Sequence, residues 1–493
     1  MICVPIIAET TEQALKDMAR AEAFADLIEI RADYIRNPDL GKILGAKNKP
    51  VIVTVTPKKE NGNFTGTEPE RTALLRQAVD LGADYIDISI NCPELGTLIE
   101  YCRDTKSIVS YHNYRETPAD IPDTLKKLES TGADIIKIAT FANKLSDCLK
   151  IFDLIRNSRK DIIALCMGEK GELSRILGPV YGSFLTFGSL ETGLESAPGQ
   201  IPAQVLKDIY RVDREPGFDL YGLIGNPVSK SRGYILFNSL FRQYGLNSLY
   251  LNFLVDDIDD FTRYFQGMLS GFSITMPLKQ DLMYILNDIA PEAEKIGAIN
   301  TIVKDKGLIT GYNTDINGVI DPLLERTPIK DKRVTLLGAG GAARAAAVGI
   351  LRKGGRLTIL NRTVSKAEAL AGELGCDFGP LSDFETLKTD ILINMTAVGM
   401  FPNVDQTPVD TVPVKDMVVF DGIYNPEKTK LLTEAEKNGC VIIPGINMFI
   451  HQAAEQFRLW TGIEPDTDQM KKILDDFSAK KTHGQNPDSE NWS

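Results

Sequence analysis

Eight β-rich segments, spaced fairly evenly through the first 190 residues, constrain the fold of this chain more than any other feature of its sequence. They cover residues 2–7, 27–33, 51–56, 85–90, 107–112, 135–140, 162–167 and 184–188. Polar or amphipathic stretches of helical length separate them, such as 10–24, 68–81 and 120–131. Strands that alternate with helices in this way predict a (β/α)8 barrel, in which catalytic side chains sit at the C-terminal ends of the strands.

Lys137 stands inside the sixth segment, which is otherwise apolar. A lysine there must reach solvent, pair with a carboxylate, or be held desolvated with a lowered pKa, and in the last case its amine can attack a carbonyl. Glu29 and Arg31 end the second segment, and His112 ends the fifth. A structural histidine and an ion pair between Lys137 and Glu29 are the plainer interpretations of the same residues. The position of both side chains at the ends of adjacent strands favours a catalytic role.

Composition narrows the class of protein. The chain has 493 residues, more than one hydrophobic core normally supports, so we expect two to four domains. A net charge of −12 argues against nucleic-acid binding. Its seven cysteines lack CxxC or zinc-like spacing, which indicates reduced thiols and no metal site. The first strand begins at residue 2 and no apolar run reaches membrane-spanning length, so a cytoplasmic protein without a membrane anchor is expected.

A glycine-rich turn predicts a nucleotide site in the second half. Gly338, Gly340 and Ala343 follow a β-rich segment and open an alanine-rich helix. Glycines let the backbone approach a pyrophosphate, and the helix N-terminus supplies amide donors and positive potential. A structural tight turn is the alternative.

The end of the next strand decides which cofactor the turn favours. NAD sites normally carry Asp or Glu there, whereas this chain has Asn361, Arg362 and Thr363. An arginine suits a 2′-phosphate, so the sequence favours NADP(H), with a surface arginine as the alternative.

Short polar motifs interrupt the apolar structure of the second half. They are NPVSKS at 226–231, GFSITMPLK at 271–279, GAINT at 297–301, GYNTD at 311–315, NMTAVGM at 394–400 and HQ at 451–452. In order and spacing these motifs resemble shikimate dehydrogenase across roughly residues 220–475. The resemblance implies an α/β substrate domain followed by a Rossmann domain.

The same resemblance implies roles for individual residues. Lys279 and Asp315 would form the catalytic pair, because hydride delivery leaves negative charge on a ketone oxygen, which a lysine stabilises and protonates while a carboxylate orients it. Taken singly, Lys279 would be a solvated helix residue and Asp315 a turn or cap residue. The implied substrate contacts are Ser229, Ser231, Thr275, Asn300, Tyr424 and Gln452. The implied cofactor contacts include Gly341, Ala342, Thr396 and Gly445.

One motif departs from the pattern of that family. Family members usually have a histidine between the two serines and continue into Ser-Pro, whereas here Lys230 separates Ser229 from Ser231, and Arg232, Gly233 and Tyr234 follow. The missing proline and the added positive charge change the expected geometry of the substrate loop.

The first half resembles type I 3-dehydroquinate dehydratase across residues 1–210, on the strand-end residues given above, the segment from Met167 to Arg175, and Ser196 and Gln200. The resemblance implies that Lys137 forms an imine with the substrate ketone, and that His112, its tautomer held by Glu29, moves the proton. Arg175 would clamp a carboxylate. Arg31, Ser196 and Gln200 would position ring hydroxyls, with Glu60 and Met167 also in the substrate site.

Thr56 is a second departure. The family typically has an arginine after the third strand, whereas this chain has Thr56 at that position, followed by Glu60 of the acidic and glycine motif. Lys58, Lys59 and Arg71 are the nearby cations that could replace the charge. We expect a functional dehydratase that binds its substrate differently from its relatives.

Together the two halves predict a bifunctional enzyme that converts 3-dehydroquinate to 3-dehydroshikimate and then reduces it to shikimate with NADPH, without a metal. Two alternatives stay open: a non-catalytic sensor or repressor of the same pathway, and a dehydratase fused to a quinate or NAD-preferring dehydrogenase. Small molecules are the only partners expected, and the sequence leaves the oligomeric state open. The expected organisation is a barrel at 1–211, a linker at 212–217, a substrate domain at 218–330, an NADP domain at 331–444, returning helices at 445–479 and a disordered tail at 480–493.

Overall fold

The computed structural model describes residues 1–410 and 413–482 and divides into two compact units. Met1–Asp219 and Asn247–Met268 form the first unit, and Leu220–Leu246 with the residues from Leu269 onward form the second. Among the described residues no helix is both long and apolar enough to cross a membrane.

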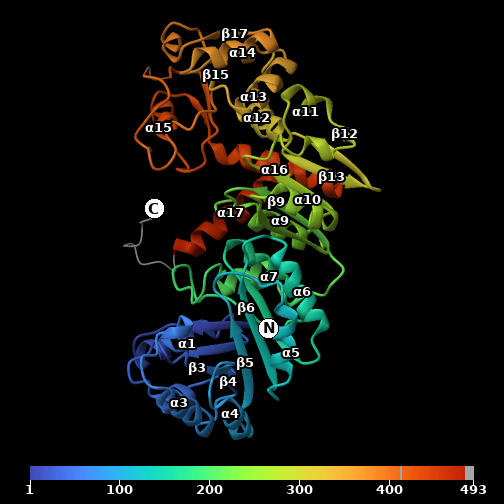
Figure 1. Ribbon diagram of the computed structural model, residues 1–493. Helices are drawn as coiled ribbons and strands as arrows, with labels where there is room; N and C mark the ends of the chain where they lie inside the picture. Colours follow the sequence, from blue (N-terminus) through green and yellow to red (C-terminus); the bar gives the residue numbers. More distant parts are fainter. Residues whose placement is uncertain (411–412, 483–493) are drawn as a thin grey trace. The chain divides into compact units, whose positions relative to one another are not determined.

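The first unit contains the predicted barrel (Figure 1). Its eight strands are joined in parallel in the order β7-β6-β5-β4-β3-β2-β1-β8. The strands are β1 (Ile2–Ile6), β2 (Leu27–Arg31), β3 (Val51–Thr54), β4 (Tyr85–Ser89), β5 (Lys106–His112), β6 (Ile135–Phe141), β7 (Asp161–Met167) and β8 (Thr186–Phe187). The backbone N–H of Phe184 donates to the carbonyl of Ile162 at 2.7 Å, which links the ends of the row. The eight predicted strands are therefore confirmed, although β8 is only two residues long.

Helices follow the strands as predicted, and in Figure 1 helices such as α1, α3 and α5 lie outside them. They are α1 (Thr11–Ala21), α2 (Leu40–Gly45), α3 (Glu68–Asp80), α4 (Leu95–Tyr101), α5 (Ile121–Glu129), α6 (Asp147–Asn157), α7 (Glu172–Leu177) and α8 (Ala203–Val205), which continues as a π-helical turn at Leu206–Tyr210. Apolar side chains of alternate strand positions, including Leu27, Ile52, Ile108 and Ile135, fill one layer of the barrel interior. Because side chains alternate along a strand, the residues two positions further on face the same way. They are Glu29, Thr54, Ser110 and Lys137, so a polar layer lies above the apolar one.

The segment Asn247–Met268 carries β10 (Ser248–Leu254) and α10 (Ile258–Tyr264) and packs with the first unit. Contacts between its acidic residues and the barrel explain why this segment belongs to the first unit. Asp256 pairs with Lys170 at 2.6 Å, and Asp260 accepts a hydrogen bond from the Ser146 amide at 3.0 Å. The predicted domain boundaries do not follow this compact division and stay predictions.

The second unit contains two sheets. In the first, β9 (Asp219–Gly225), β11 (Gly271–Ile274), β13 (Thr301–Asp305), β14 (Leu308–Tyr312) and β12 (Asp288–Ile289) are neighbours in that order, with β13 antiparallel to both β11 and β14. Its helices are α9 (Gly233–Gln243), α11 (Pro291–Ile296) and α12 (Asp315–Leu324). This is the α/β domain that the sequence predicts ahead of the glycine-rich turn.

The other sheet is parallel throughout, in the order β17-β16-β15-β18-β19-β20. Its strands are β15 (Arg333–Leu337), β16 (Arg356–Leu360), β17 (Asp377–Gly379), β18 (Ile391–Asn394), β19 (Val418–Asp421) and β20 (Val441–Ile443). The accompanying helices are α13 (Gly341–Arg352), α14 (Val364–Leu374), α15 (Lys430–Lys437), α16 (Gly445–Thr461) and α17 (Thr467–Thr482). Chain order reverses between β15 and β18, and such switch points are where open α/β sheets bind ligands.

Helix α17 corrects the predicted start of the tail. It runs to Thr482, past the predicted boundary at 479, and its residues Met470 and Leu474 are buried. The rest of the predicted tail, including His483, lies outside the described residues.

Helices α12 and α16 pack closely because Gly318 has no side chain. A Cβ at this position would come within 2.7 Å of the carbonyl oxygen of Met448 on α16. By contrast, Gly372 in α14 has open space around it.

We predict that Gly318→Ala lowers the free energy of unfolding of the second unit by about 1–3 kcal/mol, because the methyl group overpacks the contact between the helices. Gly372→Ala should instead raise it by about 0.5–1 kcal/mol, since alanine restricts the unfolded chain more than glycine. Differential scanning calorimetry of the full chain compares the two variants. Equal shifts in the same direction would contradict the close-packing argument.

Candidate active sites

Lys137 is buried in the polar layer of the barrel with 7 % of its surface exposed. Its ammonium donates to Asp87 Oδ2 at 2.8 Å and lies 3.6 Å from Glu29 Oε1. The same nitrogen sits 4.6 Å from the centroid of the Phe187 ring. Of the three alternatives for this lysine, the structure therefore selects pairing with carboxylates.

The carboxylates also decide the charge of Lys137. Burial by itself would lower the pKa of Lys137, but Asp87 and Glu29 outweigh it and hold the pKa above its ordinary value. The lysine is therefore an ammonium in the resting barrel, not the neutral amine that desolvation alone would give. It must pass a proton to a neighbouring carboxylate before it can act as a nucleophile.

Asp87 is the residue of this cluster that the sequence did not identify. It lies at the centre of β4, is fully buried, and accepts a hydrogen bond from Ser110 Oγ at 2.5 Å in addition to the one from Lys137. Burial would raise the pKa of Asp87, but Lys137 and His112 hold it below its ordinary value. Its position as a charged residue between two isoleucines of β4 is the feature of the sequence that could have identified it.

His112 lies at the end of β5, two residues beyond Ser110, which is in register with Lys137. Its ring is stacked on Tyr114, with 5.9 Å between centroids. Burial, and then the charge of Lys137, lower the pKa of His112 to about 4. The imidazole is therefore neutral near pH 7 and can accept a proton.

The part that Glu29 is expected to play in holding the tautomer of His112 stays a prediction. Within the described part of the chain no hydrogen bond joins these two residues. Glu29 instead accepts from Thr54 Oγ1 at 2.8 Å and faces Lys137. The two side chains lie in different layers of the barrel. Glu29 lies in the layer of Lys137, whereas His112 lies nearer the C-terminal ends of the strands.

Arg175 is suited to an anionic ligand. It lies on α7, the helix that follows β7, and is 1 % exposed. Its Nη2 donates to the Pro198 carbonyl at 3.1 Å. Its buried Nε has no hydrogen-bond partner among the residues that the structure describes. Burial lowers the pKa of Arg175 to about 10, so the guanidinium carries an uncompensated charge that a carboxylate would satisfy. Met167 is buried at the end of β7, in the apolar cluster of the barrel interior.

The other predicted substrate residues of the barrel are held by local contacts. Arg31 donates through Nε and Nη2 to Asp33 at 2.9 and 2.8 Å, so its fork already has a carboxylate partner. Gln200 and Ser196 bond each other twice, at 2.8 and 2.9 Å. Glu60 lies in a short 3-10 turn and accepts from Asn91 at 3.3 Å.

Thr56 is half-buried after β3. Two of the cations near it lie against Glu68. Arg71 is 2 % exposed, donates to the Val55 carbonyl at 3.3 Å and pairs with Glu68. Lys59 is exposed and lies 4.0 Å from Glu68. Arg71 therefore anchors the end of β3.

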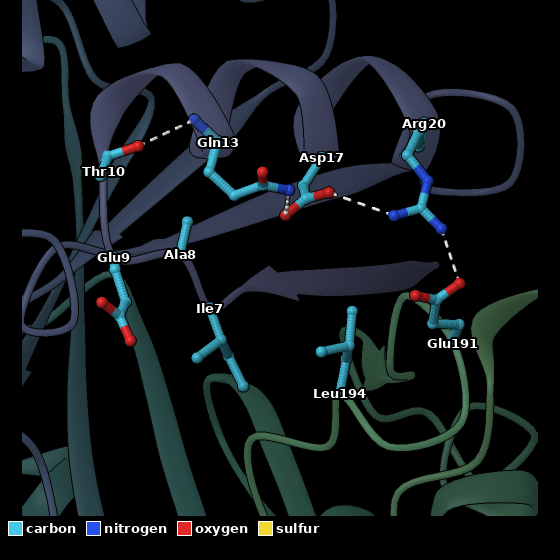
Figure 2. Close-up of a pocket in the computed structure, with 9 residues that line it drawn as sticks. All are labelled: Ile7, Ala8, Glu9, Thr10, Gln13, Asp17, Arg20, Glu191 and Leu194. Atoms are coloured by element: carbon cyan, nitrogen blue, oxygen red, sulfur yellow. Dashed lines mark hydrogen bonds and ion pairs between the residues drawn. The ribbon is translucent and has the colours of Figure 1, made fainter. Parts of the chain in front are cut away.

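A separate pocket of about 440 Å³ lies beside the mouth of the barrel (Figure 2). None of the predicted site residues lines it. Arg20 on α1 crosses it, donating to Asp17 at 3.2 Å and to Glu191 at 2.6 Å. This pair ties α1 to the loop that carries Ser196 and Gln200.

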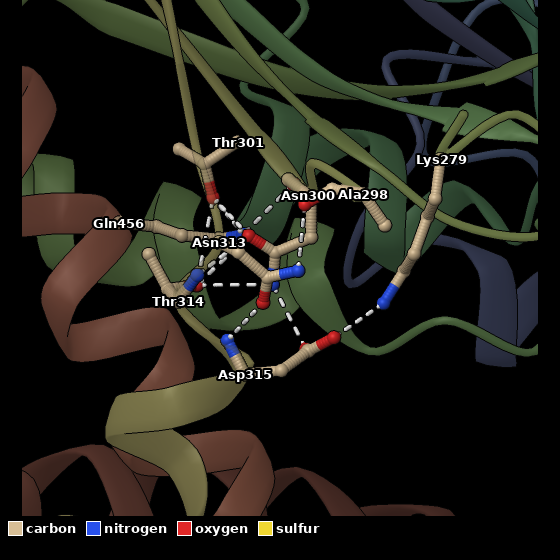
Figure 3. A network of polar contacts seen from close by, with 8 residues as sticks. All are labelled: Lys279, Ala298, Asn300, Thr301, Asn313, Thr314, Asp315 and Gln456. Atoms are coloured by element: carbon tan, nitrogen blue, oxygen red, sulfur yellow. Dashed lines mark hydrogen bonds and ion pairs between the residues drawn. The ribbon is translucent and has the colours of Figure 1, made fainter. Parts of the chain in front are cut away.

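The second unit holds a polar network around Asp315 at the start of α12 (Figure 3). Lys279 Nζ lies 2.6 Å from Asp315 Oδ2, and Asn300 Nδ2 donates to Asp315 Oδ1 at 2.8 Å. Asn300 in turn accepts from the Thr314 amide at 2.8 Å. The predicted catalytic pair is thus brought together, with Asp315 buried and Lys279 about one quarter exposed.

Further members of this network were not predicted as site residues. Asn313 Oδ1 accepts from the Asp315 amide at 3.1 Å, and Gln456 on α16 donates to Thr301 Oγ1 at 2.9 Å. Asn313 belongs to a motif that the sequence displayed, whereas Gln456 gave no signal because a glutamine on an amphipathic helix ordinarily faces solvent.

The remaining predicted substrate residues come from strand ends and α16. Gly225 ends β9 so close to Thr275 that a Cβ would lie 2.3 Å from its methyl group. Ser231 is half-buried and Ser229 exposed in the loop after β9, and Gln452 is half-buried on α16. Tyr424 is 45 % exposed, with its ring 6.3 Å from that of Phe449.

The glycine-rich turn lies between β15 and α13. Gly338 adopts φ +113° and approaches the backbone of β18, where a Cβ would be 3.0 Å from the Met395 carbonyl oxygen. Gly340 and Gly341 have open space where a Cβ would be, while Ala343 is fully buried and Ala342 half-buried. An open cradle at a helix N-terminus fits the pyrophosphate of a dinucleotide.

The residues at the ends of the neighbouring strands fit the same cofactor. Arg362 and Thr363 are exposed after β16, and Asn361 donates to the Thr363 carbonyl at 2.9 Å. Gly445 begins α16, and a Cβ there would lie 2.3 Å from the carbonyl oxygen of Ile423. Thr396 follows β18 and donates to Asn394 Oδ1 at 2.7 Å.

A buried carboxylate that the sequence did not flag supports this end of the sheet. Asp421 accepts from Asn394 at 3.0 Å, from Thr429 at 2.6 Å and from the Ile423 amide at 3.1 Å. Burial raises the pKa of Asp421 to about 6. It joins the ends of β18 and β19, between which Thr396 and Tyr424 emerge.

These features are those of a two-part α/β enzyme, with a lysine-bearing (β/α)8 barrel and a dinucleotide-binding oxidoreductase. Comparison with known proteins identifies the family. The model for type I 3-dehydroquinase matches residues 2–216, the shikimate dehydrogenase substrate binding domain residues 223–302, the shikimate / quinate 5-dehydrogenase model residues 323–422, and the shikimate 5′-dehydrogenase C-terminal domain residues 445–474.

Full-length relatives combine both parts. A bifunctional 3-dehydroquinate dehydratase/shikimate dehydrogenase of Arabidopsis thaliana, named chloroplastic, is 36 % identical over 97 % of this chain and 84 % of its own. The shikimate biosynthesis protein AroDE of Chlamydia pneumoniae is 30 % identical over 97 % of this chain and 100 % of its own. A crystal structure of a shikimate dehydrogenase in complex with NADP+ is 39 % identical, with a TM-score of 0.50 over 53 % of this chain and 96 % of that one. The chain belongs to the family of bifunctional 3-dehydroquinate dehydratase/shikimate dehydrogenases.

We predict that His112 stays neutral to about pH 4, as the lowered pKa requires. Folded His112 does not take up the proton that the unfolded chain binds below about pH 6.5, so the free energy of unfolding should fall by roughly 3 kcal/mol from this group as the pH drops from 6.5 to 4. NMR titration of the imidazole, assigned by its loss in His112→Asn, measures the midpoint. A midpoint above pH 6 would contradict the burial argument.

Proposed function

We propose that the chain dehydrates 3-dehydroquinate in its barrel and reduces the resulting 3-dehydroshikimate to shikimate with NADPH in its second unit. The observation that carries the first step is Lys137, held between Asp87 and Glu29 beside a neutral imidazole. The observation that carries the second is the Lys279–Asp315 pair in the unit that bears the glycine-rich turn.

In the barrel, the first event is transfer of a proton from Lys137 to Asp87, which already accepts its hydrogen bond. The neutral amine attacks the ketone carbon, and loss of water leaves a protonated imine. The imine draws electrons from the adjacent carbon–hydrogen bond, and neutral His112 accepts the proton released there. His112 then gives this proton to the departing hydroxyl, so that water leaves and the carbon–carbon double bond forms. Hydrolysis of the imine releases the product and restores Lys137.

Arg175 holds the substrate during these steps. A carboxylate beside it would receive the hydrogen bond of the otherwise unpaired Nε and neutralise a guanidinium that burial alone leaves uncompensated. The remaining polar groups at the mouth, Arg31, Ser196 and Gln200, position the ring hydroxyls. Glu60 and Met167 complete the predicted substrate site.

In the second unit, a dinucleotide held at the glycine-rich turn would supply the hydride for reduction of the ketone. Lys279 protonates the oxygen on which negative charge develops, while Asp315 orients the ammonium. Asn300 holds the other oxygen of Asp315, so the carboxylate keeps one orientation. Ser229, Ser231, Thr275, Tyr424 and Gln452 surround the substrate in this proposal.

The glycine-rich turn, Thr396 and Gly445 would hold the dinucleotide. Arg362 would pair with a 2′-phosphate, which favours NADPH over NADH. The relatives named as shikimate dehydrogenase (NADP(+)), such as that of Methanocaldococcus jannaschii at 42 % identity, support this preference. Placement of the enzyme in the cytoplasm stays a prediction.

The two alternative functions require different residues in the two sites. A non-catalytic sensor would not need Lys137, His112 and Asp87 in one buried cluster, since an unused buried charge is costly. An NAD-preferring dehydrogenase would not need an arginine after β16. The two experiments below test the sensor alternative and the nucleotide preference.

We predict that borohydride traps the imine on Lys137. Incubation of the full chain with 3-dehydroquinate and borohydride should add the reduced substrate to the peptide that contains Lys137, as read by mass spectrometry. Lys137→Arg keeps the charge but cannot form the imine, so it should show no adduct and lose dehydratase activity by roughly 10⁴-fold. An adduct on another lysine, or none in the wild type, would refute the mechanism.

For the dehydrogenase we predict that Arg362→Ala raises KM for NADPH about tenfold or more while leaving KM for NADH unchanged, because only NADPH carries the 2′-phosphate. Lys279→Ala should lower kcat by about 10²–10⁴-fold with either nucleotide. Rates of NADPH and NADH oxidation with 3-dehydroshikimate give both values, with exposed Lys388→Ala, ahead of β18, as a matched surface control. An equal effect of Arg362→Ala on the two nucleotides would exclude the assigned role.

A further inference from the structure

Tyr114 follows β5 and takes no part in the mechanism given above. It lies two residues beyond His112, which itself lies two residues beyond Ser110, and side chains at this spacing face the same way along a strand. Ser110 bonds Asp87 inside the barrel, so the shared direction is inward. In agreement, the Tyr114 ring packs against the apolar cluster of the barrel interior. The side chain therefore points into the barrel beside the imidazole.

The backbone around Tyr114 is fixed by its neighbour Asn113. The Asn113 amide donates to the carbonyl of Ala139 on β6 at 2.8 Å. Its side-chain Oδ1 accepts from the amides of Arg115 and Glu116 at 2.9 and 3.1 Å, so the chain turns directly after Tyr114. These contacts tie the turn to the end of the strand and fix the direction in which Tyr114 leaves the backbone.

The ring of Tyr114 lies against the imidazole of His112. The ring centroids are 5.9 Å apart and the ring planes are inclined by 15°, which is a stacked arrangement. Among the residues that the structure describes, neither ring nitrogen of His112 takes part in a hydrogen bond. Stacking restricts rotation of the imidazole, because a turned ring would lose its contact with the neighbouring face. In the resting barrel the plane of the imidazole therefore depends on Tyr114.

The hydroxyl of Tyr114 has no hydrogen-bond partner within the described part of the chain. Burial raises the pKa of Tyr114, so the group stays a phenol, which can donate a hydrogen bond. The charges of Arg31 and Lys137 both act on it, which places the phenol in the same site as the lysine. A donor is thus available beside the imidazole.

The residues that the sequence predicts for ring hydroxyls already have protein partners. Arg31 directs Nε and Nη2 to Asp33, and Ser196 and Gln200 bond each other. A substrate hydroxyl that took the place of these contacts would have to break them. Tyr114 can donate to a hydroxyl without giving up a protein partner.

We propose that Tyr114 binds the substrate and positions the base in the dehydratase site. Its hydroxyl donates a hydrogen bond to a ring hydroxyl of the substrate, and its ring holds the His112 imidazole in the plane in which it accepts and returns the proton. This inference rests on the proposed dehydration of 3-dehydroquinate. Because one side chain contacts both the base and the substrate, it sets their relative position, on which proton transfer depends.

Two substitutions separate the hydroxyl from the ring. Tyr114→Phe removes the hydroxyl and keeps the stacked ring, so KM for 3-dehydroquinate should rise about three- to tenfold while kcat stays within about twofold. Tyr114→Leu removes both, so kcat should also fall by about 10–100-fold, because the imidazole loses its orientation. Steady-state formation of 3-dehydroshikimate, followed by its ultraviolet absorbance, gives both constants. An unchanged KM in Tyr114→Phe would overturn the role of the hydroxyl, and an equal kcat in the two variants would overturn the role of the ring.

Tyr111→Phe is the matched control. Tyr111 is also half-buried, but it directly precedes His112 and so faces the other side of the strand, and loss of its hydroxyl should leave KM and kcat unchanged. Calorimetry checks that Tyr114→Leu is folded, and Tyr114→Met takes its place in the comparison if it is not.

Trapping with borohydride separates a positioning role from damage to the whole site. Formation of the imine uses Lys137 and Asp87, so Tyr114→Leu should still give the adduct on Lys137 although its turnover is slow. Loss of the adduct in this variant would overturn the positioning role. A wild type that neither forms 3-dehydroshikimate nor gives the adduct would count against the proposed function itself, whereas an active wild type matched by Tyr114→Phe and Tyr114→Leu would count against this inference alone.

Discussion

The barrel depends on how it accommodates one buried positive charge. Lys137 cannot lie among Ile108, Ile135 and Phe187 unless anions accompany it, and Asp87 and Glu29 meet that need from two other strands. The three side chains connect β6, β4 and β2 across the interior. The same anions that stabilise the ammonium also take its proton, so the contact that supports the fold is the one that the chemistry must break.

The dehydrogenase unit solves a related problem with neutral groups. Asp315 is buried, yet only one of its oxygens meets a cation, and the other meets the amide of Asn300. Because Lys279 stays partly exposed, it can exchange its proton with solvent between turnovers. Lys137, enclosed by carboxylates, exchanges its proton with neighbours first. The two lysines therefore sit in different electrostatic settings that match a nucleophile and a proton donor.

Sequence patterns predicted the positions of the strands well, but they did not predict in which layer of the barrel each side chain lies. The apolar segments rich in isoleucine and valine predicted every barrel strand, and the turn at Gly338 predicted the nucleotide-binding sheet. Asp87 was missed because Ile86 and Ile88 alternate with polar residues, which suggests that the isoleucines face the interior. In a barrel covered by helices both strand faces are buried, and here Asp87 faces inward while both isoleucines are also fully buried. Glu29 was paired with His112 through the family resemblance, and sequence order does not give the layer in which a side chain lies.

The seam between β1 and β8 is short. Only two residue pairs join these strands, Ile2 with Thr186 and Cys3 with Phe187, and the Arg20–Glu191 pair supports the seam from outside. During synthesis β1 leaves the ribosome first, but its partner follows more than 180 residues later. One edge of β1, the first strand to be synthesised, therefore stays unpaired until β8 has been made. The pairing of β1 with β8 is the strand contact of longest sequence separation in the barrel.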